Sequence, residues 1–550
     1  MAACRNLLCL CLFVTALTGL WRTQAYAGEI PHLQAHGSTQ QLVVGGHPFL
    51  ILGGELSNST ASSLDYLQAQ WSTLKPIGLN TVIAPVEWDQ VEPQKGQYDF
   101  SVVDGLIKQA RQNHVKLVLL WFGVWKNSMS TYVPAYIKHD YKTYTRAQDD
   151  RGQSQDILSA FDSDTLLADQ TAFATLMAHL KQFDDDQTVI MVQVENEIGM
   201  LPVVRDYSPQ AQAAFQGQVP SELLAYLDRH HTTLSPNVRT LWEAKGAKKI
   251  GSWPEVFGSS IEAQEVFQAW YYAAFANSLA IAGKKAYALP MYVNAALIRP
   301  GKSPGQYPSG GPLPHLFDVW KAAAPNMDIL AIDMYFPNFT EWADRFKRPD
   351  NTFFIPEANQ AGKAEAGANA FYAIGQLDSI SFSPFAIDKI TPENRGNLTD
   401  AYDVLSQLTP QILDAQGTGR MRGFRPRVSF DNVVDETPQS FVLGGYRFTV
   451  SFVDPWTPKD KQNLAANGGL IIQTADDSFI VAGSGIILTF EDASEEKMFV
   501  GIEQITEGRY TAGVWKPGRW LNGDESHQGR HLKIGSEGFS IQHLKLYKFE

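Results

Sequence analysis

Short apolar runs alternate with helical patterns along most of this chain of 550 residues. A buried parallel strand is nearly continuously hydrophobic, and parallel strands are joined by right-handed crossovers that usually contain a helix. Eight runs fit this description, at residues 48–52, 80–86, 115–121, 188–194, 290–295, 328–334, 352–355 and 380–385. The alternation therefore predicts an α/β fold, a (β/α)8 TIM barrel.

Two departures from this alternation suggest how the chain is organised. Residues 198–260 are longer than a normal crossover, so we expect an insertion that lies over the mouth of the barrel. Beyond about Arg425 the helical patterns stop, and short strands separated by Asp, Gly and Asn turns take over. This texture predicts a smaller all-β sandwich domain at 426–550, after a catalytic barrel domain at 28–425.

The N-terminus resembles a secretory signal peptide over residues 1–27. Arg5 precedes the apolar run 7–20, and Ala25-Tyr26-Ala27 fits a cleavage site, so a secreted or periplasmic protein that starts at Gly28 is expected. The three cysteines lie in this segment, which excludes disulfides and cysteine-based metal sites from the mature chain. No other apolar run is long enough to span a bilayer.

The charge of the chain excludes several classes of partner. The formal net charge is −13, and loss of Arg5 and Arg22 with the leader makes it −15. Such an acidic protein does not attract nucleic acid or anionic membranes, and a neutral carbohydrate is a more natural substrate. Histidine is scarce, and neither a metal-ligand spacing nor a dinucleotide fingerprint is present, so we expect no metal and no cofactor. The sequence does not indicate an oligomeric state.

Two glutamates follow predicted strands that are far apart in the sequence. Glu197 comes just after the run 188–194, and Glu357 comes after 352–355 and Pro356. The active site of a (β/α)8 barrel lies at the carboxyl ends of its strands. Glycoside hydrolysis requires one carboxyl as acid/base and another as nucleophile or base. A single glutamate here is more often a salt-bridge or capping residue, but two in distinctive motifs favour catalysis.

Glu195 competes with Glu197 for the acid role. The two side chains share a face if the strand period of two holds, and spacing alone does not choose between them. Glu195 lies one layer deeper, so a structural role suits it better. Asn196, between them, is expected to bond the sugar hydroxyl next to the reacting carbon, a contact that strengthens in the transition state.

Other polar and aromatic side chains are expected at the same end of the barrel because each follows or ends a strand. The tryptophans could stack on sugar rings, although packing in the core is an equally good interpretation. A tyrosine hydroxyl next to the sixth strand is placed to hold the nucleophile. These candidate substrate-binding residues are Glu55, Glu87, Trp88, Trp125, Asn127, Asn294 and Tyr335.

Three segments resemble glycoside hydrolase family 35, in the clan of retaining (β/α)8 glycosidases. They are GLNTVIAPVEWDQVEPQKGQYDF at 78–100, VQVENEIGM at 192–200 and FFIPEANQAG at 353–362. The resemblance covers about residues 40–420, and GRWLNGDESHQGR at 518–530 resembles the β-sandwich of a bacterial branch. It implies an exo-acting, retaining β-galactosidase without a cofactor, with Glu197 as acid/base and Glu357 as nucleophile.

Two positions depart from the family pattern and leave the sugar less certain than the reaction class. Residues 85–89 read PVEWD where the family has Tyr-x-Pro-Trp-Asn, and 121–123 read WFG in place of Cys-Ala-Glu. An endo-β-glucanase or β-mannanase on the same fold, with an open cleft, remains an alternative. A non-catalytic carbohydrate-binding protein is another. The resemblance also suggests xyloglucan-type plant fragments as substrates.

Overall fold

The computed structural model describes residues 29–359, 361–495 and 498–550. The predicted signal peptide, its cleavage after Ala27 and the three cysteines all lie outside these ranges. Within the described ranges, no helix combines the length and the hydropathy needed to cross a membrane.

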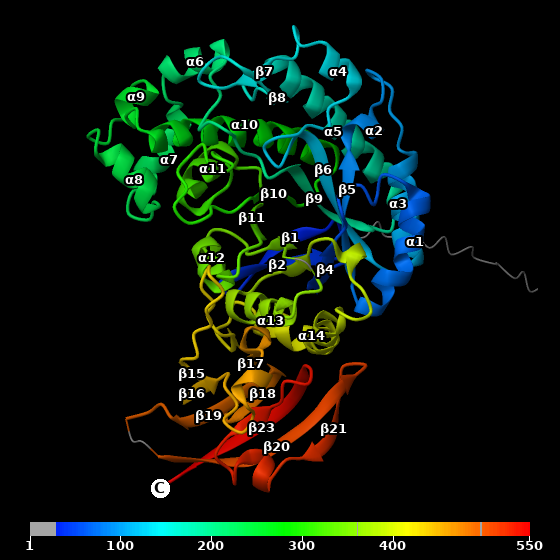
Figure 1. The fold of residues 1–550 in the computed structure, drawn as a ribbon, viewed down its shortest axis with the longest axis vertical. Coiled ribbons are helices and arrows are strands. Elements are labelled where there is room, and N and C mark those ends of the chain that lie inside the picture. The colour runs from blue at the N-terminus through cyan, green and yellow to red at the C-terminus, as the bar shows by residue number, and fades with distance from the viewer. Residues whose placement is uncertain (1–28, 360, 496–497) are drawn as a thin grey trace, which may run out of the picture.

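Eight parallel strands close into a barrel surrounded by helices, so the predicted TIM barrel is confirmed (Figure 1). The strands are, in barrel order, β4 (Ile51–Glu55), β5 (Thr81–Glu87), β6 (Lys116–Lys126), β9 (Val189–Asn196), β10 (Met291–Ala295), β11 (Ile329–Met334), β12 (Ile355–Ala358) and β13 (Ser381–Pro384). The main outer helices are α1 (Leu64–Leu74), α3 (Ser101–Gln112), α5 (Ser163–Phe183), α10 (Ile261–Ala286), α11 (Phe317–Ala323), α12 (Phe339–Phe346), α13 (Ala366–Leu377) and α14 (Gly396–Ala415).

The seventh barrel strand differs from its prediction. The sequence places it at 352–355, whereas β12 spans Ile355–Ala358 and therefore contains Glu357. Pro356 has no N–H to donate, and the pairing of β12 with β13 is irregular between Ile355 and Ala358. On the other side Glu357 pairs regularly with Asp333 of β11. The prediction ended the strand too early because a proline is normally read as a strand breaker.

A small antiparallel sheet packs against the interior side chains of the barrel. It consists of β1 (His32–His36), β2 (Thr39–Val44) and β3 (His47–Phe49), and the predicted Gly45-Gly46 turn joins the last two strands. Leu42 of β2 is completely buried in one apolar cluster with strand residues of the barrel such as Ile51 and Ile83. This sheet therefore supplies part of the barrel core.

Replacing Leu42 with alanine should lower the free energy of unfolding by about 2–5 kcal/mol. The substitution removes buried apolar atoms and leaves a cavity where Leu42 met the barrel interior. Urea unfolding of the wild type and the variant measures the difference. Leu167→Ala is the matched control because the Leu167 side chain of α5 is 62% exposed. Equal midpoints for the two variants would contradict the role of this sheet.

Short helices occupy the long segment between β9 and α10. They are α6 (Pro209–Gln216), α7 (Ser221–Arg229), α8 (Pro236–Glu243) and α9 (Trp253–Val256). Helix α7 packs on α11, and α9 packs on α10 (Figure 1). Their apolar positions, such as Leu223 of α7 and Trp253 of α9, are buried in the main core.

The C-terminal part contains two antiparallel sheets, in agreement with the predicted all-β module. The larger sheet has the order β14-β17-β18-β23-β20-β21, and the smaller has the order β15-β16-β19-β22. These strands are β14 (Met421–Phe424), β15 (Gln439–Leu443), β16 (Tyr446–Ser451), β17 (Gly468–Ala475), β18 (Ser478–Ser484), β19 (Ile486–Asp492), β20 (Phe499–Thr511), β21 (Val514–Trp520), β22 (Leu532–Ile534) and β23 (Ser540–Phe549). The module has an apolar core of its own, which includes Phe448 and Leu488.

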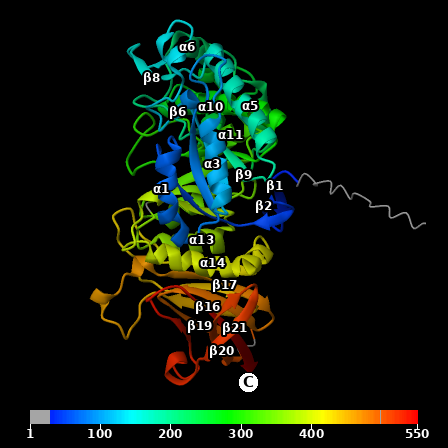
Figure 2. The same ribbon diagram turned by 90° about the vertical axis from the view of Figure 1, so that its right-hand side faces the viewer.

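The larger sheet packs against two barrel helices, α13 and α14 (Figure 2). Leu470 of β17, Ile480 of β18 and Ile541 of β23 are buried in the same apolar cluster as the barrel helices. The barrel and the β-rich module therefore share one continuous core.

Candidate active site

Glu197 lies directly after β9, at the carboxyl end of the fourth barrel strand. Its side chain is buried and accepts a hydrogen bond from the Asn127 side-chain amide, which comes from the segment after β6. Its backbone N–H donates to Asn294 Oδ1 of β10 at 2.9 Å. Predicted residues from the third, fourth and fifth strands therefore meet at this carboxyl.

Glu357 lies on the seventh strand, and its carboxyl is also buried. The Tyr335 hydroxyl donates to Glu357 Oε1, as predicted for a tyrosine next to the sixth strand. Glu55, at the end of β4, is completely buried beside the same carboxyl, and the charge of Glu357 adds to the effect of burial on the Glu55 pKa. Burial raises the pKa of Glu357 to about 7, with a further contribution from Glu197, and burial raises the pKa of Glu55 well above its ordinary value.

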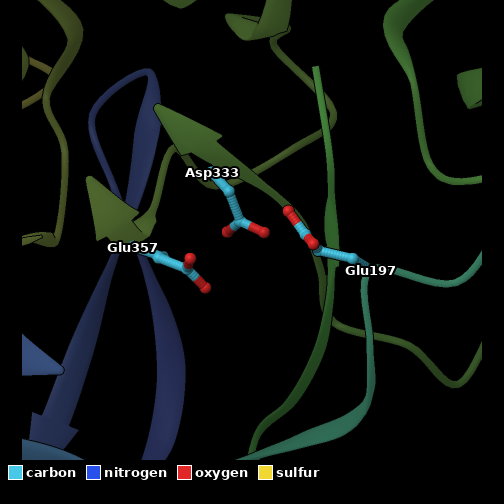
Figure 3. A group of neighbouring side chains, drawn as sticks. All are labelled: Glu197, Asp333 and Glu357. Carbon is cyan, nitrogen blue, oxygen red and sulfur yellow. The ribbon is translucent and has the colours of Figure 1, made fainter. Parts of the chain in front are cut away.

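Asp333 is a third carboxyl at this site, and sequence reasoning missed it. It belongs to β11, is completely buried, and accepts a hydrogen bond from Asn294 Nδ2 at 2.7 Å. One oxygen each from Asp333, Glu197 and Glu357 lie within 4.8 Å of one another (Figure 3). Burial, followed by the charges of Glu357 and Glu197, raises the pKa of Asp333 well above its ordinary value. An acid in the otherwise apolar run 329–334 was the available signal.

A metal ion is one use to which such a set of oxygens can be put. Among the described residues, Glu197, Asp333 and Glu357 form the one group of this kind. Hard cations such as Ca²⁺ take carboxylate oxygens, but they also need six to eight ligands. Glu197 and Glu357 already accept hydrogen bonds from Asn127 and Tyr335, so the protein itself holds both carboxyls in place.

Lys126 is a buried cation beside these carboxyls, and it too was not among the predicted site residues. It ends β6, is 5% exposed, and donates from Nζ to Asn196 Oδ1 at 2.8 Å. Its charge lowers the pKa of both Glu55 and Glu357, against the larger effect of burial. A buried lysine is costly unless it is paired, so we infer that it compensates the negative charge of the site.

Lys126→Met should shift the acidic limb of the pH profile of kcat/KM upward by about one unit or more. Glu357 must be ionised to act as a nucleophile, so activity rises as the pH passes its pKa of about 7. Loss of the neighbouring cation raises that pKa, and the limb then moves to higher pH. The pH dependence of hydrolysis measures this shift. Lys285→Met, at the exposed end of α10, is the control, and an unmoved limb in Lys126→Met would contradict the assignment.

Glu195 does not share a face with Glu197, so that expectation is wrong. Both residues have positive φ, 62° and 46°, and this turns the chain out of the regular strand period. Glu195 Oε2 accepts a hydrogen bond from the backbone N–H of Trp125 at 2.8 Å, and the Glu195 carboxyl interacts with Asp169 of the outer helix α5. Burial raises the pKa of Glu195 and raises that of Asp169 to about 6. Glu195 therefore lies behind the barrel wall, in a structural setting.

Both predicted stacking tryptophans are in the core, so their assignment to substrate binding is wrong. Trp88 starts the short helix α2 (Trp88–Val91), is completely buried, and donates from Nε1 to Glu92 at 2.9 Å. Trp125 is also completely buried, and its ring meets Tyr272 and Phe275 of α10 at centroid distances of 5.2 and 4.7 Å. The apolar layer between strands and outer helices takes these rings because alternate strand residues face it.

Glu87 ends β5 and is half-buried. Burial, followed by the charge of Asp89, raises its pKa to about 7. Glu87 lines a small cavity together with Val102 and Val103 of α3, away from the central group. The structure thus brings together seven of the predicted residues with two that were not predicted. The predicted ones are Glu55, Asn127, Asn196, Glu197, Asn294, Tyr335 and Glu357, and the other two are Lys126 and Asp333.

Comparison with known families gives two matches to this chain. Residues 61–268 match the model of glycoside hydrolase family 42, which is described as beta-galactosidase. Residues 398–533 match a domain of unknown function, DUF5597, which begins within the last barrel helix and covers most of the β-rich module. The first match supports a β-galactosidase-like glycoside hydrolase acting on a carbohydrate. The expected membership of family 35 finds no support, because the matching family is a different one.

Among curated proteins, no sequence matches this chain. Solved structures that resemble it include the β-galactosidase from Bacillus circulans sp. alkalophilus, at 15% identity and a TM-score of 0.45, with 68% of this chain and 58% of that chain covered. The β-galactosidase from Rahnella sp. R3 has 14% identity, a TM-score of 0.44, and coverage of 69% and 57%. The β-mannanase from the blue mussel Mytilus edulis has 12% identity, a TM-score of 0.40, and coverage of 68% and 96%. The chain spans less than two thirds of the two β-galactosidases.

Proposed function

We propose that this chain is an exo-acting β-galactosidase that hydrolyses its substrate with retention of configuration. The observation that supports this proposal is the approach of Glu197 and Glu357, which offer oxygens within 4.8 Å of each other from the fourth and seventh strands. Retaining glycosidases hold their two carboxyls about 5–5.5 Å apart, whereas inverting enzymes leave about 6.5–9.5 Å for a water molecule. The match of residues 61–268 to a β-galactosidase family favours galactose as the sugar.

In the first step of the proposed mechanism, Glu197 donates its proton to the glycosidic oxygen. Glu357 attacks the anomeric carbon from the opposite face, the bond to the leaving oxygen breaks, and a glycosyl-enzyme ester forms. In the second step Glu197, now ionised, takes a proton from water. The water oxygen attacks the anomeric carbon, the ester bond breaks, and Glu357 is released as a carboxylate.

The neighbouring polar groups fit supporting roles in this sequence. The Asn127 amide fixes the orientation of the Glu197 carboxyl, and the Tyr335 hydroxyl does the same for Glu357. The hydrogen bond from Tyr335 and the charge of Lys126 both favour the ionised form of Glu357, against its burial. Held in this way, the two carboxyls need little rearrangement to react.

The contacts to the sugar are proposed from the remaining polar groups. Asn196 has a side-chain nitrogen without a partner, and Asp333 has a free oxygen, so each retains capacity to bind a hydroxyl. Glu55 also has one oxygen without a partner. These buried groups would be satisfied by the hydroxyls of one terminal sugar, in keeping with exo action. The signal-peptide pattern and terminal galactose together suit a secreted or periplasmic enzyme that trims plant fragments of the xyloglucan type.

A panel of aryl β-glycosides tests the proposal with the mature chain. Turnover of the β-galactoside, with little or none of the β-glucoside and β-mannoside, is the expected result, and NMR should show the β-anomer of galactose first. Preferred cleavage inside linear β-glucan or β-mannan would favour the endo-acting alternative. Binding of galactosides without turnover of any substrate would favour a non-catalytic carbohydrate-binding protein.

A further inference from the structure

An aromatic strip begins one residue away from the contact with Glu357. Tyr335 bonds the glutamate, and the next residue, Phe336, is half-buried. The Phe336 ring lies 6.4 Å from Trp342 of α12 and 5.4 Å from Phe430, between ring centroids. The guanidinium carbon of Arg299 lies 5.6 Å from the centroid of the Phe336 ring. We call the two half-buried rings, Phe336 and Phe430, the aromatic strip, and Trp342, which is 5% exposed, supports it from the core.

The strip joins parts of the chain that are far apart in sequence. Phe336 follows β11, and Arg299 lies in the segment after β10, whose Asn294 bonds both Glu197 and Asp333. Phe430 comes from the stretch between α14 and β15, which runs from the β-rich module up to α12 in Figure 1. The C-terminal part of the chain therefore reaches the carboxyl end of the barrel.

Phe430 is carried by a formed hairpin rather than by an irregular loop. Val428 and Val434 make an antiparallel bridge, and the Ser429 N–H donates to the Val433 carbonyl at 2.9 Å. Asn432 takes the left-handed conformation that closes the tip, with φ at 63°. A hairpin held in this way presents its side chains in a fixed direction, which lowers the entropic cost of binding.

The strip and the hairpin leave apolar surface and space for a ligand. Phe336 and Phe430 are only half-buried, and Val433 at the hairpin tip is 66% exposed. A cavity of about 630 Å³ lies between α12 and the hairpin, beside the strip rather than on it, and Val433 lines it together with charged side chains such as Glu341 and Arg427. A second cavity, of about 890 Å³, lies on the other side of α12 and is lined by Ile298 and Trp342. Ligand pockets in proteins have volumes of this order.

We propose that the aromatic strip binds the leaving-group sugars of an oligosaccharide whose terminal residue is cleaved between Glu197 and Glu357. Sugar rings offer C–H faces that pack on aromatic rings, and the exposed Arg299 guanidinium donates hydrogen bonds to their hydroxyls. The proposal rests on the glycosidase function above and extends it to substrate class. The preferred substrate is an oligosaccharide rather than a small galactoside, and the hairpin of the β-rich module helps to select it.

The test compares two substrates with Phe430→Ala. One is the β-glycosyl fluoride of the sugar that the wild type cleaves, because its single-atom leaving group cannot reach the strip. The other is a xyloglucan oligosaccharide ending in the same sugar. Loss of the stacked ring should raise KM for the oligosaccharide, so that the ratio of its kcat/KM to that of the fluoride falls about tenfold. Phe430→Trp should keep the wild-type ratio.

Phe499→Ala is the control, because Phe499 is an exposed phenylalanine at the start of β20 in the larger sheet. It should leave the ratio unchanged, and thermal unfolding of each variant shows whether the fold is intact. A folded Phe430→Ala enzyme with the wild-type ratio would overturn the proposal, as would an equal loss on both substrates. If the wild type hydrolysed neither substrate, the proposed glycosidase function would be overturned instead.

Discussion

Glu357→Ala is expected to reduce kcat on aryl β-galactosides by on the order of 10⁴-fold or more, because removal of a covalent nucleophile leaves no second route of comparable rate. The methyl group leaves space beside the anomeric carbon, where Glu55, Asp333 and Tyr335 surround the missing carboxyl. A small anion such as azide can occupy that space. It should attack from the face that Glu357 used and give the α-galactosyl azide.

Mass spectrometry and NMR of the product identify the azide and its anomeric configuration. Glu393→Ala is a suitable control because the Glu393 side chain is exposed on the segment after β13. That variant should retain wild-type kcat and form no azide adduct. Substantial remaining activity in Glu357→Ala, or a β-configured azide from it, would assign the nucleophile to another carboxyl, of which Glu55 and Asp333 are the nearest.

Glu197→Ala should give a loss that depends on the leaving group. Protonation by a positioned carboxyl contributes about 10²–10⁴-fold, and an oligosaccharide leaving group needs it because an alkoxide leaves poorly. A glycosyl fluoride needs far less help, so its first step should proceed almost normally. The glycosyl-enzyme then accumulates, and azide should release it as the β-galactosyl azide, since two inversions precede the product.

Glu195→Gln provides a sharp contrast, because Glu195 is also a glutamate at the end of β9. Its carboxyl interacts with Asp169 behind the barrel wall, so the change should alter the thermal midpoint rather than the dependence on leaving group. Pre-steady-state kinetics with the fluoride and with an oligosaccharide separate the two behaviours. If Glu195→Gln gave the β-galactosyl azide and Glu197→Ala did not, Glu195 would be the acid/base and Glu197 the structural residue.

The alternation of apolar runs was sufficient to predict the barrel, because strand and helix periods differ and each run is short. Glu197 and Glu357 could be predicted for a related reason, since a carboxyl is costly at the end of a buried strand unless it has a use. Asp333 and Lys126 carry the same signal within the runs 329–334 and 116–126. Asp333 was missed because it was read as part of a strand rather than as an exception to it. Lys126 was missed because the predicted strand ended at residue 121 and left Lys126 in the loop that follows, whereas β6 continues to Lys126.

The direction of side chains at strand ends was not predictable from the period of two. Positive φ at Glu195 and Glu197 sends the two carboxyls to opposite sides of the barrel wall, and no sequence pattern at these glutamates indicates that conformation. The prediction that Trp88 and Trp125 bind substrate was wrong for a similar reason. A large aromatic ring after a strand can pack under the outer helices as readily as it can stack on a sugar, and both rings are completely buried. The contact of Phe430 with Phe336 depends on the docking of a distant module, which only the tertiary structure shows.

The core shared by the barrel and the β-rich module bears on how such enzymes can be divided and recombined. Truncation near residue 425 would remove Leu470, Ile480 and Ile541 from the apolar cluster that they share with α13 and α14. An apolar face of the barrel would then be exposed to water. Expression of the barrel alone, or its transfer onto another binding module, therefore does not suit this architecture. In evolution as in engineering, the two parts are expected to be gained, lost and exchanged as a single unit.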